Sequence, residues 1–380
     1  MRTVRDLDVR GRRVLVRADL NVPLRDGAVA DDTRIRAALP TVEYLLDNGA
    51  TVILCSHLGR PKGEPKPELS LRPVADRIAA LLGRPVAFGD EHGDLRLLEN
   101  LRFDPREERN DPALAAELAA MADLYVDDAF GAAHRAHAST EGVAHMLPSA
   151  AGLLLAAELD AFRQLLEDPE HPFVVVIGGV KVADKIGVID RFTQIADTIL
   201  IGGAMAFTFL ASQGVDVGDS RREDEVGQET ARRVTADARE RGCELLLPVD
   251  VVVADRFAED ADSRTVAAQE IPAGWMGLDI GARTVQLYAQ RLSQARTIFW
   301  NGPMGVFEME PFAAGTIGIA HAVADSGATS VVGGGDSVAA VNVAGVADRI
   351  THISTGGGAA LELVEGRELP GVAALEEVPA

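Results

Sequence analysis

The segment FVVVIGGVKVADK, residues 173–185, decides how this chain of 380 residues folds. Its first five residues form a continuous apolar run rich in β-branched side chains, which is typical of a parallel strand buried on both faces. The glycines and polar residues that follow predict a turn leading into a helix. Such a junction suits a phosphate, because the N–H groups at the start of a helix have no partner within the helix.

Lys181 and Lys185 lie in this turn, and they are two of only four lysines among the 37 basic residues of the chain. A lysine ammonium is a compact, rotatable charge suited to a moving phosphoryl group, whereas an arginine is a rigid fork. Two surface lysines one helical turn apart would produce the same pattern, so the pair alone leaves both interpretations open.

The same alternation of apolar run, polar turn and amphipathic stretch recurs along the whole chain. It predicts an α/β fold with two doubly wound parallel-sheet domains of the Rossmann-like type, joined by a helix and hinge. The expected strands are residues 13–16, 51–55, 86–88, 95–98, 124–126, 173–177, 198–201, 244–247, 297–300, 330–332 and 352–353. The stretch 152–168 has apolar residues at helical spacing and is expected to be the helix that joins residues 1–151 to residues 169–357.

Bulk composition limits the classes of partner. The net charge of −21 argues against nucleic acid, whose phosphates require a basic face, but permits a small anion in a local basic pocket. No apolar stretch is long enough for a membrane span, and the N-terminal stretch lacks the apolar region of a signal peptide. Cys55 and Cys243 lie in or beside strand-like runs, which suits a reducing compartment. We therefore expect a cytoplasmic protein.

Polar side chains follow the expected strands of the first half. Asp19 and Asn21 suit a ligand hydroxyl, although such residues also stabilise ordinary turns. The basic candidates are His57, Arg102, Arg135, Arg60 beside Gly59, and Arg34 at an expected helix start. One arginine alone would be a surface ion pair, but four that converge on one sheet edge predict a pocket for a carboxylate or phosphate.

The second half has glycine-rich turns, which suit a nucleotide polyphosphate. In GGGDSVAAV (333–341), free amides and the helix dipole favour a phosphate, and Asp336 suits Mg²⁺. Glu308 is placed to accept hydrogen bonds from ribose hydroxyls. Neither a P-loop nor a clear dinucleotide fingerprint is present.

Taken together, the motifs resemble the phosphoglycerate kinase family. The resemblance extends over almost the full chain, through VRADLNVP, HLGRPKG, LLENLRF, DDAFGAAHRAHAST, GGVKVADKIGVID, IGGAMAFTFL, LPVDVVVADRF, GLDIG, WNGPMGVFE, GGGDS and STGGGAALELVEG. It implies a kinase that uses Mg²⁺ and ATP/ADP to transfer a phosphoryl group reversibly to the carboxylate of 3-phosphoglycerate, giving 1,3-bisphosphoglycerate, in glycolysis and gluconeogenesis. It also implies a monomer.

The resemblance also assigns roles to positions. It makes residues 1–151 the 3-phosphoglycerate domain, 169–357 the nucleotide domain, and 358–380 a segment that returns to the first domain. The implied acceptor-binding residues are Asp19, Asn21, Arg34, His57, Leu58, Gly59, Arg60, Arg102 and Arg135. The implied ATP-binding residues are Lys185, Gly277, Glu308, Gly334, Gly335, Asp336 and Ser337, with Asp336 as the Mg²⁺-linked acid. The implied catalytic residues are Arg34, Lys181, Gly334 and Gly335.

A carboxylate acceptor needs no general base, so positioning and electrostatics would dominate the reaction. Because the two groups of charges lie on different domains, the cleft must close before they meet, and we expect the 152–168 helix to be part of the hinge.

The chain departs from the family pattern mainly between Val86 and Leu97, where it is short. This leaves open a related kinase for another small carboxylate. Asp127 also stands where an Asn is common. An NAD(P)-dependent oxidoreductase would share the α/β layout but lacks its fingerprint here, and a non-catalytic nucleotide-binding protein would not need both lysines and all the arginines.

Overall fold

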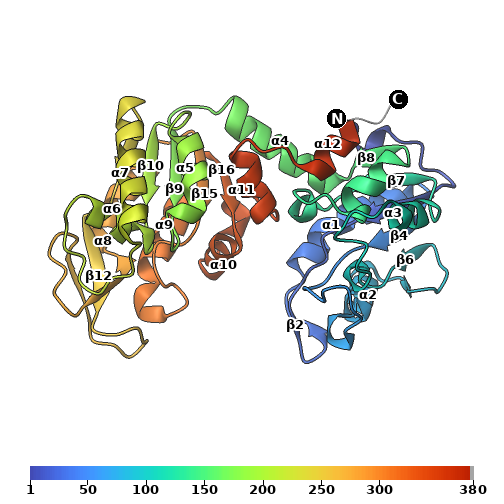
Figure 1. Ribbon diagram of the computed structural model, residues 1–380, viewed down its shortest axis with the longest axis horizontal. Coiled ribbons are helices and arrows are strands. Elements are labelled where there is room, and N and C mark those ends of the chain that lie inside the picture. Colours follow the sequence, from blue (N-terminus) through green and yellow to red (C-terminus); the bar gives the residue numbers. More distant parts are fainter. Residues whose placement is uncertain (377–380) are drawn as a thin grey trace. The chain divides into compact units, whose positions relative to one another are not determined.

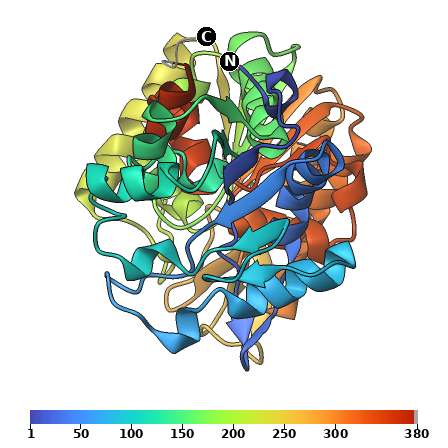
Figure 2. The same cartoon turned by 90° about the vertical axis from the view of Figure 1, so that its right-hand side faces the viewer.

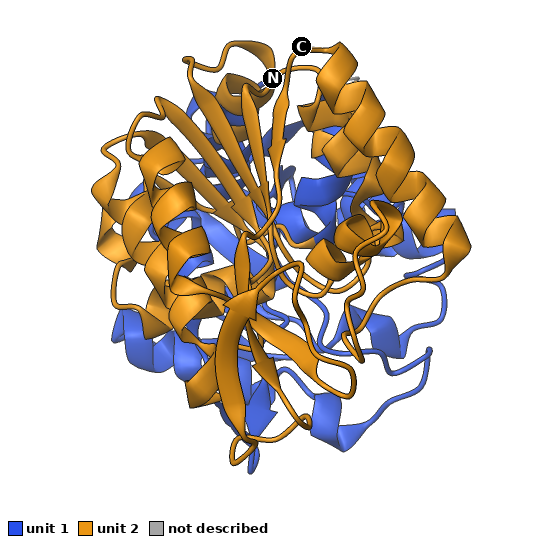
Figure 3. Ribbon diagram, turned by 90° about the vertical axis from the view of Figure 1, so that its left-hand side faces the viewer, with its two compact units in different colours: residues 1–160, 358–363, 367–380 blue, residues 161–357, 364–366 orange. Residues whose placement is uncertain are grey.

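The structure is a computed structural model, and it describes residues 1–376. The chain divides into two compact units, shown in different colours in Figure 3. Unit 1 contains residues 1–160, 358–363 and the segment from 367 onward, and unit 2 contains residues 161–357 and 364–366.

Unit 1 is built on a six-stranded sheet in which every pair of neighbours is parallel (Figure 1). In spatial order the strands are β5 (Ala87–Phe88), β6 (Leu95–Leu97), β4 (Thr51–Cys55), β1 (Arg13–Arg17), β7 (Leu124–Asp127) and β8 (Ser149–Ala151). The helices of this unit are α1 (Thr33–Asp47), α2 (Arg72–Leu82), α3 (Pro112–Ala119) and α12 (Pro370–Glu376). A two-stranded ribbon, β2 (Leu24–Arg25) with β3 (Ala28–Val29), precedes α1.

The central strands of unit 1 are buried because they are apolar on both faces. Val14, Val16, Val52 and Leu54 pack in one cluster with apolar residues of α1 and α2, such as Ile35. Burial of these side chains is the main stabilising contribution expected for such a core. It fixes the strand ends from which the polar residues project.

Unit 2 repeats the layout with a second six-stranded parallel sheet. Its order is β11 (Glu244–Leu246), β10 (Thr198–Ile201), β9 (Phe173–Ile177), β15 (Thr297–Asn301), β16 (Thr329–Gly333) and β17 (His352–Ile353). Its helices are α5 (Ile186–Phe192), α6 (Met205–Ser212), α7 (Glu225–Glu240), α8 (Ala282–Leu292), α9 (Ala314–Asp325) and α10 (Gly335–Val343). The expected doubly wound fold class is therefore confirmed, and all eleven predicted strands are present.

Unit 2 also contains an antiparallel sheet that the sequence analysis missed. β12 (Asp250–Ala254) pairs with β13 (Ser263–Ala267) on one side and β14 (Met276–Ile280) on the other. The short strand β8 of unit 1 was missed as well. The prediction of parallel sheets alone was incomplete, because antiparallel pairing depends on partners that local apolar runs do not reveal.

Helix α4 (Leu153–Glu167) occupies the stretch where a joining helix was predicted. Helix α11 (Gly358–Val364) follows the last strand, and α12 packs against β8 and the helical turns at 138–142 and 143–145 of unit 1 (Figure 2). The last four residues of the expected returning segment, 377–380, lie outside the described part of the chain. Among residues 1–376, no helix is both long and apolar enough to cross a membrane.

Candidate active site

The strand order of unit 2 reverses between β9 and β15, and Lys185 lies just beyond this point. Its ammonium donates to the Gly178 carbonyl at 2.8 Å, to the Asn301 carbonyl at 3.1 Å and to Asn301 Oδ1 at 2.5 Å. Gly178 follows β9 and Asn301 ends β15, so one ammonium joins both strand ends. Parallel α/β sheets bind ligands in the crevice at such a reversal.

Burial lowers the pKa of Lys185 to about 8, while the nearby carboxylates of Asp336 and Asp184 oppose the shift. At neutral pH the side chain is still charged. Lys181 differs from it, because its side chain is exposed in the turn between β9 and α5. The structure thus gives the two lysines different surroundings: Lys185 is fixed by three carbonyl-type acceptors, and Lys181 is at the surface of unit 2.

The glycine turn after β16 leads into α10. Gly334 has a φ of +91°, a conformation that suits glycine, and a side chain there would place its Cβ 2.7 Å from Asn301 Nδ2. Asn301 Nδ2 donates to the Gly333 carbonyl at 2.7 Å, so this residue connects Lys185 to the glycine turn. Asp336 lies in the first turn of α10 with its side chain exposed. The arrangement provides free N–H groups, an ammonium and a carboxylate near one point.

Ser337 is fully buried, and its hydroxyl accepts a hydrogen bond from the Gly302 N–H at 2.6 Å. The contact fixes the turn after β15 to α10. Sequence reasoning assigned Ser337 to ATP binding, and the structure gives this hydroxyl a partner within the protein.

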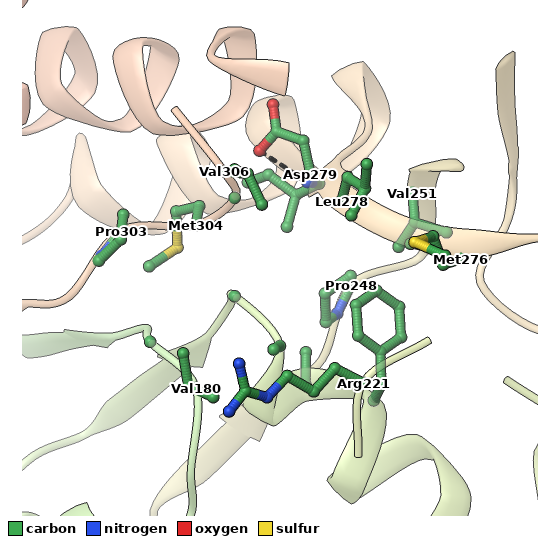
Figure 4. A pocket seen from close by; sticks show the side chains of 18 of the residues that line it. Val180, Arg221, Pro248, Val251, Met276, Leu278, Asp279, Pro303, Met304 and Val306 are labelled. Atoms are coloured by element: carbon green, nitrogen blue, oxygen red, sulfur yellow. Dashed lines mark hydrogen bonds between the residues drawn. The ribbon is translucent and has the colours of Figure 1, made fainter. Parts of the chain in front are cut away.

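A pocket of about 460 Å³ opens in unit 2 next to these groups (Figure 4). This volume is in the range of small-molecule sites. Its walls come from the turns after β9, β10 and β15 and from strands β12 and β14 of the antiparallel sheet. The lining includes Gly179, Gly277, Pro303, Met304, Glu308 and Asp336. The pocket therefore combines apolar walls with the polar groups of Asp336 and Glu308.

Gly277 has a clear physical reason to be glycine. A Cβ there would lie 2.1 Å from the ring of Phe207, which also lines the pocket, and its N–H donates to Ser220 Oγ at 2.9 Å. Glu308 is exposed at the pocket lining. Both of these predicted nucleotide-binding residues, together with Asp336, line one cavity.

Asp279 of the pocket lining was not predicted from the sequence. Its carboxylate is buried and accepts hydrogen bonds from the N–H groups of Gly315, at 2.6 Å, and Ile280, at 2.9 Å. Burial raises the pKa of Asp279 to about 7, and the two N–H donors oppose that shift. The carboxylate holds the start of α9 against β14, and so fixes one wall of the pocket.

In unit 1, a connected series of hydrogen bonds joins five of the predicted acceptor-binding residues. Arg34 donates to Asp19 Oδ2 at 2.9 Å and to the Asn21 carbonyl at 3.3 Å. Asn21 Oδ1 accepts from the Gly59 N–H at 2.9 Å, and the Gly59 carbonyl accepts from Arg102 Nη1 at 3.0 Å. The structure thus brings together side chains that lie as far apart in sequence as residues 19 and 102.

Arg102 is buried, and burial lowers its pKa to about 10, although Glu108 opposes the shift. Its Nε lies 3.2 Å from Glu108 Oε1. The guanidinium therefore keeps its charge at neutral pH. The short segment before it is also ordered against the sheet, because Arg96 Nε donates to the Gly89 carbonyl at 2.5 Å.

His57 is buried beside Arg17, a residue that sequence reasoning did not select. Arg17 Nη2 lies 3.0 Å from His57 Nδ1, and Arg17 Nε donates to Ser139 Oγ at 2.9 Å. Burial, and then the positive charge of Arg17, hold the pKa of His57 well below its usual range. The imidazole is consequently neutral at physiological pH.

The remaining predicted residues of unit 1 differ in exposure. Leu58 is buried, Arg60 is exposed, and Arg135 is half-buried with its Nε 3.1 Å from His134 Nε2. Arg34, expected to act together with Lys181, belongs to unit 1, whereas Lys181 belongs to unit 2.

Comparison with known families fits this geometry. The model of the family described as phosphoglycerate kinase matches residues 4–367. The chain belongs to the phosphoglycerate kinase family. A curated phosphoglycerate kinase from Rubrobacter xylanophilus is 61% identical, over 99% of this chain and 98% of that protein. One from Chloroflexus aurantiacus is 56% identical over 99% of both chains.

Solved structures of phosphoglycerate kinases also resemble this one. The enzyme from Coxiella burnetii has a TM-score of 0.91 and 40% identity, over 99% of this chain and 98% of that one. The enzyme from Pyrococcus horikoshii has a TM-score of 0.82 and 32% identity, over 99% of this chain and 98% of that one. Within this phosphoglycerate kinase fold, Arg17, Asp279 and Asn301 are polar groups of the two sites that were not among the predicted site residues. The sequence does contain a signal for these residues, because each is a charged or amide side chain within or at the end of an apolar strand.

Proposed function

We propose that this protein catalyses the reversible transfer of a phosphoryl group between ATP and the carboxylate of 3-phosphoglycerate. The products are ADP and 1,3-bisphosphoglycerate, so the reaction is a step of glycolysis and gluconeogenesis. The observation that carries the proposal is the pocket of unit 2, which places apolar walls next to an ammonium, free N–H groups and a carboxylate. These are the groups that a nucleoside triphosphate with its metal requires.

In this proposal unit 2 binds the nucleotide. Lys185, Gly334, Gly335 and Ser337 bind its phosphates, Gly277 lies against the base, and Glu308 accepts from the ribose. Unit 1 binds 3-phosphoglycerate through the hydrogen-bonded series of Arg34, Asp19, Asn21, Gly59 and Arg102, with His57, Leu58, Arg60 and Arg135 around it. The positive charge of the arginines suits a ligand that carries both a phosphate and a carboxylate.

The acceptor carboxylate is ionised at neutral pH, so the protein does not have to remove a proton. What remains is to position two anions and to stabilise charge on the transferring group. Lys181, Arg34 and the amides of Gly334 and Gly335 are proposed to do this. Asp336 is exposed in the pocket lining and suits Mg²⁺, which prefers one or two carboxylates together with phosphate oxygens. Bound Mg²⁺ would neutralise phosphate charge.

We further propose that the protein works as a cytoplasmic monomer without nucleic-acid or membrane partners, and that its two units approach one another when both substrates bind. Helix α4 is the proposed hinge, because it continues from one unit into the other. Closure would bring Arg34 and Lys181 to the same phosphoryl group and exclude water from it.

The proposal is tested by ATP-dependent phosphorylation of 3-phosphoglycerate, coupled to NADH oxidation. The Lys181→Ala variant is expected to lower turnover at least about 100-fold without loss of the fold, as for removal of one transition-state donor. Lys66→Ala is the matched control, because it removes the same charge from another loop. Normal turnover in Lys181→Ala would refute the role of Lys181, and no turnover in the unmodified protein would refute the proposed function.

A further inference from the structure

Arg221 lines the proposed nucleotide pocket of unit 2 from the loop that precedes α7. Its side chain is exposed, and in Figure 4 its guanidinium extends along the pocket towards Val180, with Val306 and Leu278 on the opposite wall. Within residues 1–376, no hydrogen bond or ion pair holds this guanidinium. A fork of five donors without a protein partner is therefore available at the pocket.

The backbone that carries Arg221 is fixed against the pocket wall. The Asp219 N–H donates to the Trp275 carbonyl at 2.9 Å, and Ser220 Oγ accepts from the Gly277 N–H at 2.9 Å. Gly218 has a φ of +56°, and a Cβ there would lie 2.6 Å from the Trp275 carbonyl oxygen. This close approach, with the two hydrogen bonds, holds residues 218–220 on strand β14 and its preceding turn. The backbone position from which the Arg221 side chain extends is therefore fixed.

The part of the pocket that Arg221 reaches is the part suited to a base. Lys185, proposed to bind phosphate, and Asp336, proposed to bind Mg²⁺, lie towards the glycine turns after β9 and β16. Val180 and Met304, from the turns after β9 and β15, and Leu278, from strand β14 of the antiparallel sheet, give the pocket apolar surfaces. A flat purine suits such surfaces, because its faces are apolar and its edges are polar. The Asp279 carboxylate points away from this opening towards Gly315, so it does not neutralise the guanidinium.

We propose that Arg221 donates two hydrogen bonds to the O6 and N7 edge of a guanine base, and that this protein therefore uses GTP and GDP as well as ATP and ADP. The inference rests on the proposed function of this pocket. The two adjacent acceptors of guanine match the fork of a guanidinium, whereas adenine presents an acceptor beside an amine donor. Adenine is not excluded, because the Asp219 carboxylate also lines the pocket and can accept from that amine.

The test measures kcat/KM for GTP and for ATP with 3-phosphoglycerate. In the unmodified protein, we expect GTP to be within about tenfold of ATP. Arg221→Leu is expected to lower the GTP-to-ATP ratio about 10-fold to 100-fold, as for loss of one bidentate base contact. Arg221→Lys is expected to lower it nearly as much, because a lysine keeps the charge but lacks the fork.

Arg222→Leu is the matched control. Arg222 is the next residue, is also exposed, and donates to the Gly218 carbonyl at 3.2 Å without lining the pocket. Arg222→Leu removes the same charge from the same loop. It should leave the GTP-to-ATP ratio of kcat/KM unchanged within about twofold, as expected for a surface charge that does not contact the nucleotide.

Three results would overturn the inference. The first is activity with ATP but none with GTP. The second is an equal loss of kcat/KM for both nucleotides in Arg221→Leu, which would mean that Arg221 contacts a phosphate. The third is an unchanged GTP-to-ATP ratio of kcat/KM in Arg221→Lys. If neither nucleotide phosphorylates the acceptor, the proposed function fails instead. Calorimetric binding of GDP and ADP then still tests Arg221, since the same variant ratios apply to Kd. In that measurement, an equal loss of affinity for GDP and for ADP in Arg221→Leu would also overturn the inference.

Discussion

Nη2 of the Arg17 guanidinium lies 3.0 Å from Nδ1 of the His57 ring. A guanidinium has donors only, so Nδ1 must be the acceptor and the ring proton must be on Nε2. Because burial and Arg17 also hold the pKa of His57 well below its usual range, the ring is neutral. His57 is then a hydrogen-bond donor through Nε2, as an anionic acceptor substrate would require.

The first prediction is that the ¹⁵N NMR spectrum of His57 shows the neutral Nε2–H form without change between pH 5 and pH 8. In Arg17→Lys, a single ammonium cannot serve Ser139, the Ala18 carbonyl and His57 together, as the native fork does. We expect this variant to show mixed tautomers and a kcat/KM for 3-phosphoglycerate reduced at least about tenfold. The KM for ATP serves as the control and should not change. Titration of the native ring near pH 6.5 would contradict the assignment.

The second prediction concerns the pH dependence of nucleotide use. The pKa of Lys185 is about 8 in the folded protein, lowered from 10.5 mainly by burial. The ammonium is therefore present below about pH 8 and is lost as the pH rises through that value. The value of kcat/KM for ATP reports the free enzyme. We expect it to fall above pH 8, with a limiting slope of about tenfold per pH unit.

The Lys185→Arg variant separates this charge from other causes of the decline. A guanidinium stays charged over the accessible pH range but does not fit the three acceptors as an ammonium does. The variant is expected to have a lower kcat/KM at pH 7 and no decline between pH 8 and pH 9.5. An identical alkaline limb in both proteins would assign the decline to a different group.

The third prediction is that Asp127→Asn stabilises the protein above neutral pH. Asp127 Oδ1 accepts from the Ala129 N–H at 2.9 Å, whereas Oδ2 is buried without a hydrogen-bond partner in the described chain. Burial raises the pKa of Asp127 to about 7. Because the folded state holds this proton more tightly than the unfolded state, stability is lost as the pH rises from about 4 to about 7.

An Asn at this position cannot ionise, so its advantage in the free energy of unfolding should increase over that pH range and then stay constant. The increase should be about 4 kcal/mol, by the difference between the folded pKa of about 7 and the ordinary value of 3.8. Urea unfolding at pH 5, 7 and 8.5 measures it. Asp26→Asn, in the exposed turn between β2 and β3, removes one surface charge as the control and should change stability by less than about 0.5 kcal/mol. Lower stability of Asp127→Asn at pH 8.5 would mean that Arg17 requires the carboxylate.

The parallel sheets could be predicted from the sequence because buried parallel strands are continuous apolar runs, as in β9 and β15. The antiparallel sheet could not, because strand β12 pairs with residues up to Ile280, and nothing near Val251–Val253 indicates that partner. This sheet forms one wall of the pocket in unit 2, so the side of the pocket that we propose binds the base was the part that sequence reasoning left incomplete.

Among the site residues, too, some positions could be predicted from the sequence and others could not. Lys185 and the Gly334 turn follow strands directly, and their position at a sheet edge could be inferred. Arg17 and Asp279 act through partners distant in sequence: Ser139 is 122 residues from Arg17, and Gly315 is 36 residues from Asp279. A charged side chain next to an apolar run indicated only that some buried partner must exist.

The fourth prediction concerns Gly334, whose φ of +91° and short distance to Asn301 both disfavour a side chain. In Gly334→Ala the new methyl group would meet Asn301 Nδ2 at 2.7 Å and displace the amide that joins Lys185 to the Gly333 carbonyl. We expect kcat/KM for ATP to fall at least about tenfold and stability to fall by about 1–3 kcal/mol. Steady-state kinetics and urea unfolding measure the two effects.

Gly345→Ala separates the clash from the strain. Gly345 also has a positive φ, +67°, but a Cβ there meets nothing within 4 Å. This variant should lose about 1 kcal/mol of stability from backbone strain alone and keep the native kcat/KM for ATP. If Gly334→Ala lost no more kcat/KM for ATP than Gly345→Ala, the contact with Asn301 would not govern the glycine turn before α10, because backbone strain would then account for both variants.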